Sequence, residues 1–344
     1  MNRLVQIEGL CKHYPLARGL FRKPSPLRAV EDVSLTMNRG RNLGLVGESG
    51  CGKSTLGRSV LRLVEPTSGR VTIDGIDVTS LSGRALLAFR RRAQMIFQDP
   101  YGSLNPRMTV RQALCEPLRI HRLCQTKKQE NERLCELLSN VGLPERSLQQ
   151  YPHEFSGGQR QRIVIARALA VSPSLLVCDE PVSALDVSIQ AQIVNLLLDV
   201  QQQTGLTYLF ISHDLKVVKH LCDEIAVMYV GRLVEHATAE QLFLRPRHPY
   251  TQALIAAIPR PPDAASLNRL SPRLRGEILA GETPSLQNPP SGCAFHPRCR
   301  RYEHAGRPEI CRTQRPQLTV LDPAPDGSCP TRVACHLQNQ SQTE

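Results

Sequence analysis

The decisive stretch of this sequence is Gly47-Glu48-Ser49-Gly50-Cys51-Gly52-Lys53-Ser54, between the strand-like run NLGLV and the helix-like run TLGRSVLRL. It has the pattern G-x-x-x-x-G-K-[ST] of a phosphate-binding loop, in the strand–loop–helix setting that the pattern requires. The glycines let backbone N–H groups turn toward phosphate oxygens at a helix start, where the helix dipole favours negative charge. We therefore predict a nucleotide site in which Lys53 contacts the β- and γ-phosphates and Ser54 binds Mg²⁺. Its predicted residues are Gly47, Ser49, Gly50, Cys51, Gly52, Lys53, Ser54 and Thr55.

An acidic pair, Asp179 and Glu180, ends another strand-like run, SLLVCDE. A carboxylate at the end of a buried strand can hold Mg²⁺ through water. The acidic residue that follows can orient and deprotonate an attacking water. Such a pair can also serve only as a cap. Combined with the phosphate loop, it indicates an NTPase with Asp179 at the metal and Glu180 as general base.

The composition is typical of a soluble globular protein, with 344 residues, 41% of them hydrophobic and 22% charged. At about 150 residues per domain, this length suggests two domains. Lys and Arg outnumber Asp and Glu by 43 to 31, so acidic partners such as nucleotide phosphates, nucleic acid or anionic lipid are expected. No apolar run approaches about 18 residues, and the N-terminus does not resemble a signal peptide. We expect a cytosolic protein without a membrane-spanning helix.

Strand-like and helix-like runs alternate through residues 1–240. The strand-like runs are VQIEGL, VTIDGIDV, SLLVCDE, LTYLFIS and EIAVMYVGRLVEH. Leu134, Leu137, Leu138 and Val141 have helical spacing. This alternation predicts an α/β domain with a largely parallel sheet. The basic, Pro-containing residues 16–28 indicate a surface loop. From residue 259 the chain is Pro-rich, which predicts a loop-rich appendage joined to the domain by a helix over 249–258.

The segment Phe155-Ser156-Gly157-Gly158-Gln159-Arg160-Gln161-Arg162 resembles the signature motif of the ATP-binding cassette (ABC) family, with Phe where Leu is commoner. In that family it opens a helix that caps the γ-phosphate held by the other subunit of a dimer. Ser and two Gly before a helix-like run agree with an anion-accepting helix start, although an ordinary helix cap has the same pattern. The resemblance implies a P-loop NTPase of the ABC ATPase type with a helical subdomain at about 100–170. It assigns Ser156, Gly157, Gly158 and Gln159 to ATP.

Other landmarks match the same family. Gln98 resembles the glutamine that touches Mg²⁺ and the attacking water, in a loop (98–105) that contacts the membrane subunit. His213 resembles the histidine that contacts the γ-phosphate, although a lone His after a strand is often a capping residue. Residues 183–186 resemble the loop that crosses the dimer interface. Tyr14 resembles the aromatic that stacks on adenine, and packing alone would also account for it.

A narrower resemblance covers nearly the whole chain. The ATP-binding subunits of dipeptide/oligopeptide importers have segments similar to HYP…GLF, GESGCGKSTLGR, DPYGSLNPR, PVSALDVS, RPRHPYTQAL and the Cys-rich tail. The closest match is the dipeptide member that pairs with a second ATPase. This resemblance implies an ATPase that energises peptide import at the cytoplasmic face of the inner membrane. Its partners would be a second ABC ATPase subunit, two permease subunits and an extracytoplasmic peptide-binding protein.

Two other readings stay open. The same importer architecture can serve nickel, sugar, glutathione or an antimicrobial peptide, because the cargo pocket belongs to other subunits. A soluble ABC ATPase acting on nucleic acid is disfavoured, since the chain has one cassette and no aromatic-basic binding module. We therefore expect ATP and Mg²⁺ as ligands and no nucleic acid. The domains implied are 1–240 for nucleotide binding and 241–344 for a C-terminal, oligopeptide-importer-type domain with a cysteine cluster.

Cysteines are concentrated in that tail. The resemblance maps Cys293, Cys299, Cys311 and Cys335 onto the ligands of a [4Fe–4S] cluster. Their spacing, C-x5-C-x11-C with a distant fourth, leaves zinc or reduced cysteines without a metal as alternatives. Cys329 competes with Cys335 as fourth ligand. The remaining cysteines show no ligand spacing and are predicted to be structural: Cys11, Cys115, Cys124, Cys135, Cys178 and Cys222.

Overall fold

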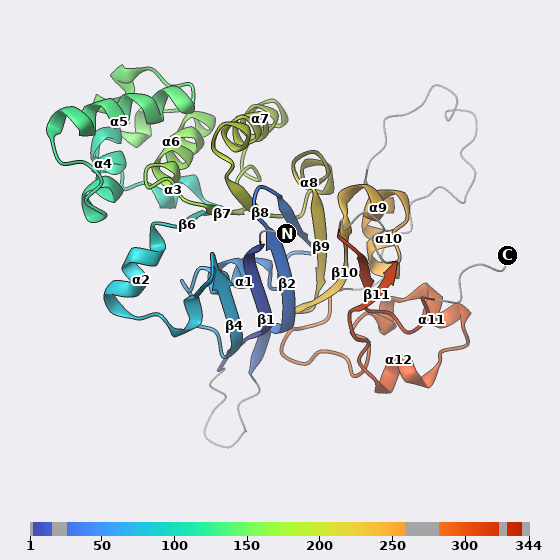
Figure 1. The fold of residues 1–344 in the computed structure, drawn as a ribbon. Helices are drawn as coiled ribbons and strands as arrows, with labels where there is room; N and C mark the ends of the chain where they lie inside the picture. Colours follow the sequence, from blue (N-terminus) through green and yellow to red (C-terminus); the bar gives the residue numbers. More distant parts are fainter. Residues whose placement is uncertain (1–2, 16–25, 259–281, 323–328, 339–344) are drawn as a thin grey trace, which may run out of the picture.

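Two β-sheets form the centre of the molecule (Figure 1). The structure is a computed structural model that describes residues 3–15, 26–258, 282–322 and 329–338. One sheet is antiparallel, in the order β2-β1-β4-β5, and the larger has the order β11-β12-β10-β9-β3-β8-β7-β6. The strands are β1 Arg3–Tyr14, β2 Leu27–Asn38, β3 Leu43–Val46, β4 Ser68–Ile73, β5 Ile76–Asp77, β6 Ala93–Ile96, β7 Leu175–Asp179, β8 Thr207–Ser212, β9 Glu224–Tyr229, β10 Arg232–Thr238, β11 Thr319–Asp322 and β12 Thr331–Val333.

The larger sheet confirms the predicted parallel core. Strands β9, β3, β8, β7 and β6 run parallel to one another, whereas β10 pairs antiparallel with β9. β3, β7, β8 and β9 are buried along their whole length, as expected for apolar strands covered on both faces. The smaller antiparallel sheet was not anticipated. Burial partly alternates along its strand β2, which shows that one face of that sheet packs on the core.

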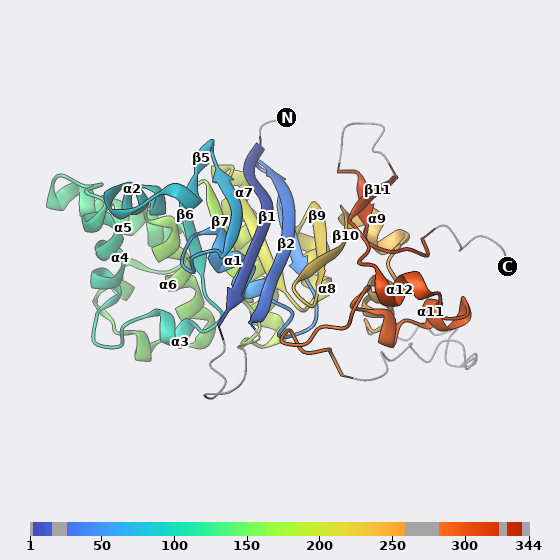
Figure 2. The ribbon, with the colours of Figure 1, turned by 90° about the horizontal axis from the view of Figure 1, so that it is seen from below.

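Helix α1 (Lys53–Val60) lies between the two sheets and contacts both (Figure 2). Leu56 and Val60 are fully buried there. A Cβ at Gly57 would approach a side-chain atom of Ile211 to 2.7 Å, so the helix lies very close to β8. The helix that begins at the phosphate loop is thereby fixed in the core. Helix α8 (Leu215–Leu221) packs against β3 and β8, and α7 (Val187–Thr204) packs beside it.

Helices α3 to α6 form a group at one end of the molecule (Figure 1). Three of them begin with capping boxes, at Thr109, Thr126 and Ser156, which satisfy backbone N–H groups of the first turn. The predicted helix over Leu134, Leu137, Leu138 and Val141 is confirmed, and all four side chains are fully buried. The helices are α3 Pro100–Ser103, α4 Val110–Ile120, α5 Lys127–Asn140 and α6 Gly157–Leu169, preceded by α2 Gly83–Arg90 and interspersed with the 3₁₀ helices η2 Glu145–Gln149 and η3 Pro152–Glu154.

Two predicted single strands are in fact hairpins. VTIDGIDV divides into β4 and β5 at a turn through Asp74 and Gly75, followed by the 3₁₀ helix η1 (Val78–Ser80). EIAVMYVGRLVEH divides into β9 and β10 at Val230 and Gly231, both with positive φ. Because apolar residues continue on both sides of each turn, the sequence pattern predicts one continuous strand where the chain in fact reverses direction. Of the predicted loop over 16–28, residues 16–25 lie outside the described residues, and Leu27 and Arg28 belong to β2.

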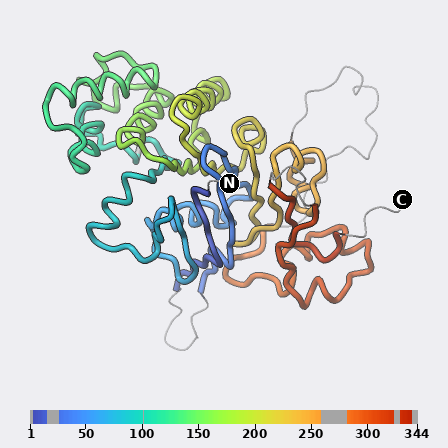
Figure 3. The backbone as a smooth tube through the Cα atoms, in the orientation of Figure 1, coloured from blue at the N-terminus to red at the C-terminus, as the bar shows by residue number. Residues whose placement is uncertain are grey.

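The C-terminal segment is more structured than a loop-rich appendage. The predicted helix over 249–258 is present as α10 (Pro249–Ala256). Later, β12 pairs with β10 and β11 pairs with β12, both antiparallel, so the tail extends the central sheet (Figure 3). The other elements here are α9 Ala239–Leu244, η5 His296–Arg298, α11 Arg300–His304 and α12 Glu309–Thr313. In the described part of the chain, no helix is both long enough and apolar enough to cross a membrane.

Candidate active site

The phosphate loop joins the buried strand β3 to α1. Gly52 has φ +107, and a Cβ there would lie 1.9 Å from the carbonyl oxygen of Ala29, so only glycine fits. A Cβ at Gly47 would lie 2.2 Å from the carbonyl oxygen of Met228. Ser49 and Gly50 are exposed, whereas Cys51 is buried. The side of the loop that holds Gly47 and Gly52 is therefore packed tightly against the core, whereas Ser49 and Gly50 are open to solvent, as a phosphate-binding loop requires.

Lys53 is buried although it is charged. Its ammonium donates hydrogen bonds to the carbonyls of Gly47 and Glu48, at 2.8 and 2.9 Å, and lies 3.9 Å from the sulfur of Cys51. These contacts hold the positive charge inside the loop. Ser54 and Thr55, the next two residues, are half-buried at the start of α1.

Asp179 meets Ser54 across 125 positions of sequence: the Ser54 hydroxyl donates to Oδ1 of Asp179 at 2.7 Å. Asp179 is fully buried, and its Oδ2 has no hydrogen-bond partner among the described residues, although the Arg58 guanidinium lies 3.7 Å away. Burial raises the pKa of Asp179, and the Ser54 hydrogen bond and the Arg58 charge oppose this rise. A buried carboxylate oxygen without a donor, next to a hydroxyl, fits the oxygen ligands that Mg²⁺ prefers.

Glu180 is the centre of a second contact group. Its backbone has φ +47, and its N–H donates to the carbonyl of Ile211 at 2.9 Å, which turns the side chain out of the sheet. Gln98 Nε2 donates to Glu180 Oε2 at 2.9 Å, and Nδ1 of His213 lies 3.1 Å from Oε1. The structure thus brings together three predicted catalytic residues from the ends of β6, β7 and β8.

The predicted signature segment begins α6. Ser156 caps the helix: its hydroxyl accepts from the N–H of Gln159, and the Gln159 side chain accepts from the Ser156 N–H. A Cβ on Gly158 would lie 2.5 Å from Ile189, so α6 lies very close to the start of α7. Asp186, in the 183–186 loop, caps α7 by accepting from the N–H of Ile189. Gly157 packs against Leu185 of that loop.

Tyr14 ends β1, opposite Leu27 of β2. The ammonium of Lys12 lies 4.8 Å from the centre of its ring. This places an aromatic face at the end of the smaller sheet, but no contact tests its stacking on adenine, which stays a prediction.

Sequence reasoning missed what surrounds Glu48 of the phosphate loop. The Tyr250 hydroxyl accepts from its N–H at 2.8 Å, and Arg298 makes a two-pronged ion pair with its carboxylate. These partners lie 202 and 250 positions away, and no local pattern marks them.

The four predicted cluster cysteines lie near one another. Burial, followed by the charges of neighbouring cysteines, raises the pKa of Cys293 to about 12, opposed by a hydrogen bond from the backbone of Phe295. The neighbours that raise it are Cys335, Cys299 and Cys311. The Cys293 N–H donates to the Cys311 carbonyl at 2.9 Å. All four thiols are free of disulfides and partly or fully buried.

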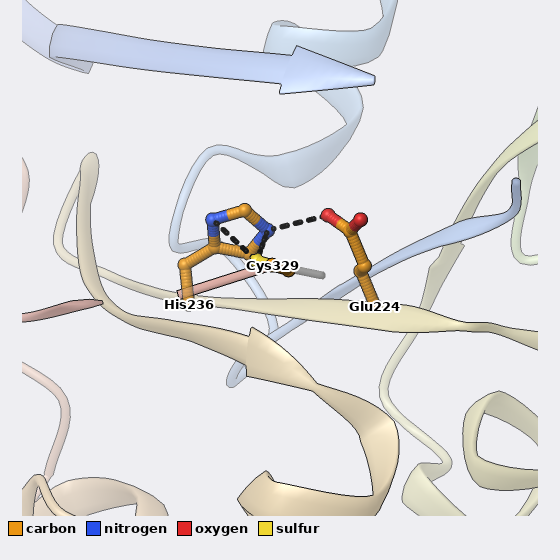
Figure 4. Close-up of side chains that lie close together, drawn as sticks. All are labelled: Glu224, His236 and Cys329. Carbon is orange, nitrogen blue, oxygen red and sulfur yellow. Dashed lines mark hydrogen bonds and ion pairs between the residues drawn. The ribbon is translucent and has the colours of Figure 1, made fainter. Parts of the chain in front are cut away.

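Cys329 belongs to another group, with Glu224 of β9 and His236 of β10 (Figure 4). Nε2 of His236 lies 3.1 Å from Oε2 of Glu224, and the Cys329 sulfur lies 3.5 Å from Nε2 and 3.8 Å from Nδ1 of the same ring. Burial raises the pKa of Glu224, but the contacts with His236 and Cys329 and the charge of Arg41 outweigh it and lower the pKa overall. The ligand atoms of Glu224, His236 and Cys329 lie within 4.8 Å of one another, as in a site that could hold a metal ion. The Arg332 guanidinium lies 3.4 Å from Nδ1 of His236 and places positive charge beside this group.

Comparison with known proteins agrees with this geometry. The ABC transporter family model matches residues 30–183, and the model of the oligopeptide/dipeptide transporter C-terminal region matches residues 234–305. "Probable peptide ABC transporter ATP-binding protein y4tS" of Sinorhizobium fredii is 52% identical over 98% of this chain and 90% of its own length. Oligopeptide transport ATP-binding protein AppF of Bacillus subtilis is 46% identical over 97% of both chains.

Among solved structures, the cassette MJ0796 bound to ADP and Pi is similar with a TM-score of 0.61 and 29% identity. The match covers 69% of this chain and 99% of that one. The predicted ABC ATPase fold is therefore confirmed. The chain belongs to the ATP-binding proteins of ABC peptide transporters, and it is an ATPase coupled to transport.

Proposed function

We propose that this protein hydrolyses ATP to drive the import of dipeptides or oligopeptides across the cytoplasmic membrane. The observation that carries the proposal is one chain that joins an ABC phosphate loop and its acidic partners to a C-terminal segment of the oligopeptide/dipeptide transporter type. The relatives named as peptide transporter ATP-binding proteins match nearly its whole length.

In this proposal the nucleotide is held by the residues of the phosphate loop, with Tyr14 stacked on adenine. Ser54, Gln98 and Asp179 would hold Mg²⁺, which neutralises phosphate charge when it is bound. Glu180 orients the attacking water and accepts its proton, and His213 and Gln98 hold the Glu180 carboxylate in place. His213 also contacts the γ-phosphate.

The signature residues Ser156, Gly157, Gly158 and Gln159 act on the ATP of a second ABC ATPase subunit. Support comes from the helix start at Ser156, whose orientation is fixed by a capping box. The similar cassette MJ0796 is described as dimeric. We assign residues 1–240 to nucleotide binding and 241–344 to the C-terminal segment. The further partners are two permease subunits, met by the loop 98–105, and an extracytoplasmic peptide-binding protein, with the ATPase at the cytoplasmic face of the membrane.

We also propose that Cys293, Cys299, Cys311 and Cys335 hold a [4Fe–4S] cluster. Support comes from the proximity of these thiols, since the charges of Cys335, Cys299 and Cys311 all act on Cys293. Four cysteine thiolates are the ligand set of such a cluster. Cys329 is engaged with His236, which favours Cys335 as the fourth ligand.

Metal analysis after anaerobic purification tests the cluster. We expect four irons per chain, lost in Cys335→Ser and kept in the matched variant Cys329→Ser. One zinc per chain, or iron retained by Cys335→Ser and lost from Cys329→Ser, would contradict the assignment.

Uptake of labelled di- and tripeptides by cells that carry wild-type or Glu180→Gln protein tests the transport function. We expect uptake to disappear only in the variant. Undiminished peptide uptake, with loss of nickel, sugar or glutathione uptake instead, would identify another cargo. Salt-sensitive DNA binding would favour the nucleic-acid alternative.

A further inference from the structure

The phosphate loop is held from outside by the C-terminal segment. Arg298, the last residue of η5, donates from Nη1 to Glu48 Oε2 at 2.9 Å and from Nη2 to Oε1 at 3.1 Å. The Arg298 side chain is only 7% exposed and that of Glu48 22% exposed. Such a two-pronged pair fixes orientation as well as charge, because the guanidinium plane matches the carboxylate plane.

Two more contacts hold the same residue. The hydroxyl of Thr283 donates to Glu48 Oε2 at 2.5 Å, and the Glu48 N–H donates to the Tyr250 hydroxyl at 2.8 Å. Burial raises the pKa of Glu48, but Arg298 and Thr283 outweigh it, so the pKa lies below its ordinary value. The carboxylate is therefore ionised and compensated, and all three partners come from beyond residue 240.

Glu48 in turn touches the lysine that the nucleotide needs. Its carbonyl accepts from the Lys53 ammonium at 2.9 Å, beside the carbonyl of Gly47. A displaced Glu48 would therefore move the anchor of Lys53. An uncompensated carboxylate in a phosphate-binding loop would also repel the phosphates. Arg298 counters both effects: it holds Glu48 in place, and it neutralises the carboxylate that would repel the phosphates.

Arg298 is also joined to the four cysteines. It directly precedes Cys299, whose N–H closes a turn with the His296 carbonyl at 3.2 Å. Phe295, at the start of this turn, packs against Tyr229 and Tyr250, with ring centres 5.3 and 5.5 Å apart. The turn that carries one cluster cysteine is thus the turn that delivers Arg298 to the phosphate loop.

We propose that Arg298 is a positioning residue of the nucleotide site, and that through it nucleotide affinity depends on the four-cysteine segment. The second half of this statement rests on the cluster proposed above, whereas the first rests only on residues of the chain. The two sites are linked because binding effects are reciprocal. If the contact between Arg298 and Glu48 favours the loop conformation that binds nucleotide, then bound nucleotide must in turn stabilise the four-cysteine segment.

Equilibrium binding of a fluorescent ATP analogue, together with KM and kcat for ATP, tests the first half. We expect Arg298→Gln to raise the Kd and KM about tenfold, within the usual range for coupled sites, and to change kcat little. Arg298→Lys keeps the positive charge but cannot make two parallel hydrogen bonds, so its Kd and KM should lie between those of wild type and Arg298→Gln. The matched control is Arg315→Gln, which breaks a 3.8 Å contact between the same C-terminal segment and Glu31 of β2. The Kd and KM of Arg315→Gln should stay within twofold of the wild-type values.

A double-mutant cycle guards against a general loss of structure. Because Glu48→Gln removes the charge that Arg298 compensates, the double variant Glu48→Gln/Arg298→Gln should bind nucleotide better than Arg298→Gln alone. Additive losses, or a Kd for Arg298→Gln within twofold of wild type, would overturn the positioning role.

The coupling to the cysteines has its own readout. Cys299→Ser should lose iron and weaken nucleotide binding to the same extent as Arg298→Gln, with no further loss when the two are combined. If the wild type holds no iron while Arg298→Gln still weakens binding, the cluster proposal fails and the positioning role stands. If iron is present and Cys299→Ser binds nucleotide normally, the coupling is refuted.

Discussion

Replacing Glu180 by glutamine removes the predicted general base while keeping the shape of the side chain. Glu180 accepts one hydrogen bond from Gln98 at 2.9 Å and faces His213 at 3.1 Å. Glutamine has nearly the same shape and keeps one acceptor oxygen, and the amide of Gln98 can turn to meet the new donor. At about 1 kcal/mol net per hydrogen bond, the free energy of unfolding should fall by no more than about 1 kcal/mol.

The loss in rate should be much larger. A positioned general base contributes about 10²- to 10⁴-fold, which corresponds to roughly 3–5 kcal/mol at about 1.36 kcal/mol per tenfold. Lys53, Ser54 and Asp179 are unchanged, so nucleotide affinity should stay within a few-fold. The variant is therefore expected to fold and bind ATP but to hydrolyse it at least a hundredfold more slowly.

Phosphate release at saturating Mg–ATP, nucleotide binding and thermal unfolding are measured on the same purified protein. The control Glu116→Gln removes a carboxylate that pairs with Arg167 at 2.7 Å on the surface, and it should leave the rate within twofold. Hydrolysis by Glu180→Gln within tenfold of wild type, with normal nucleotide affinity, would show that another group accepts the proton.

Three further outcomes are expected. Gly52→Ala should abolish nucleotide binding, because its Cβ would lie 1.9 Å from a backbone oxygen that cannot move aside; retained affinity in an equilibrium titration would refute this. Burial lowers the pKa of His248 to about 3, against about 6.5 when unfolded, so below pH 6.5 the unfolded chain binds the extra proton and stability falls. From pH 7 to 5.5, urea unfolding should show about 1 kcal/mol more loss in wild type than in His248→Asn, and equal losses would argue against a buried neutral imidazole. Glu224→Gln removes the partner of buried His236 and should destabilise the fold by about 3 kcal/mol, whereas exposed Glu132→Gln should not, both read from unfolding midpoints.

The sequence could predict those parts of the site whose chemistry is local. The phosphate loop, the acidic end of β7 and the capped start of α6 each need particular residues at fixed spacing. Each can therefore be recognised from a short sequence motif. Gln98, Glu180 and His213 were predicted as separate residues, and only the parallel order of β6, β7 and β8 brings them together.

What escaped prediction depends on distant parts of the chain. The turns at Gly75 and Gly231 lie inside apolar runs, so periodicity alone read each run as one strand. The pairing of β12 with β10 and the contact of Arg298 with Glu48 join residues about 100 and 250 positions apart. Cys329 has the same residue type as the cluster cysteines, and only the placement of His236 beside it distinguishes its surroundings.

The strands at the C-terminus have a consequence for how the molecule avoids self-association. Without β11 and β12, the backbone N–H and C=O groups of β10 at Glu235 and His236 would form an open sheet edge, and such edges template pairing with other chains. In the full chain this edge is covered, and the new outermost strand, β11, is four residues long and ends in Asp322, which pairs with Arg247. We therefore expect a cassette cut after residue 240 to expose an unpaired sheet edge and to aggregate more readily than the chain that keeps its C-terminal segment.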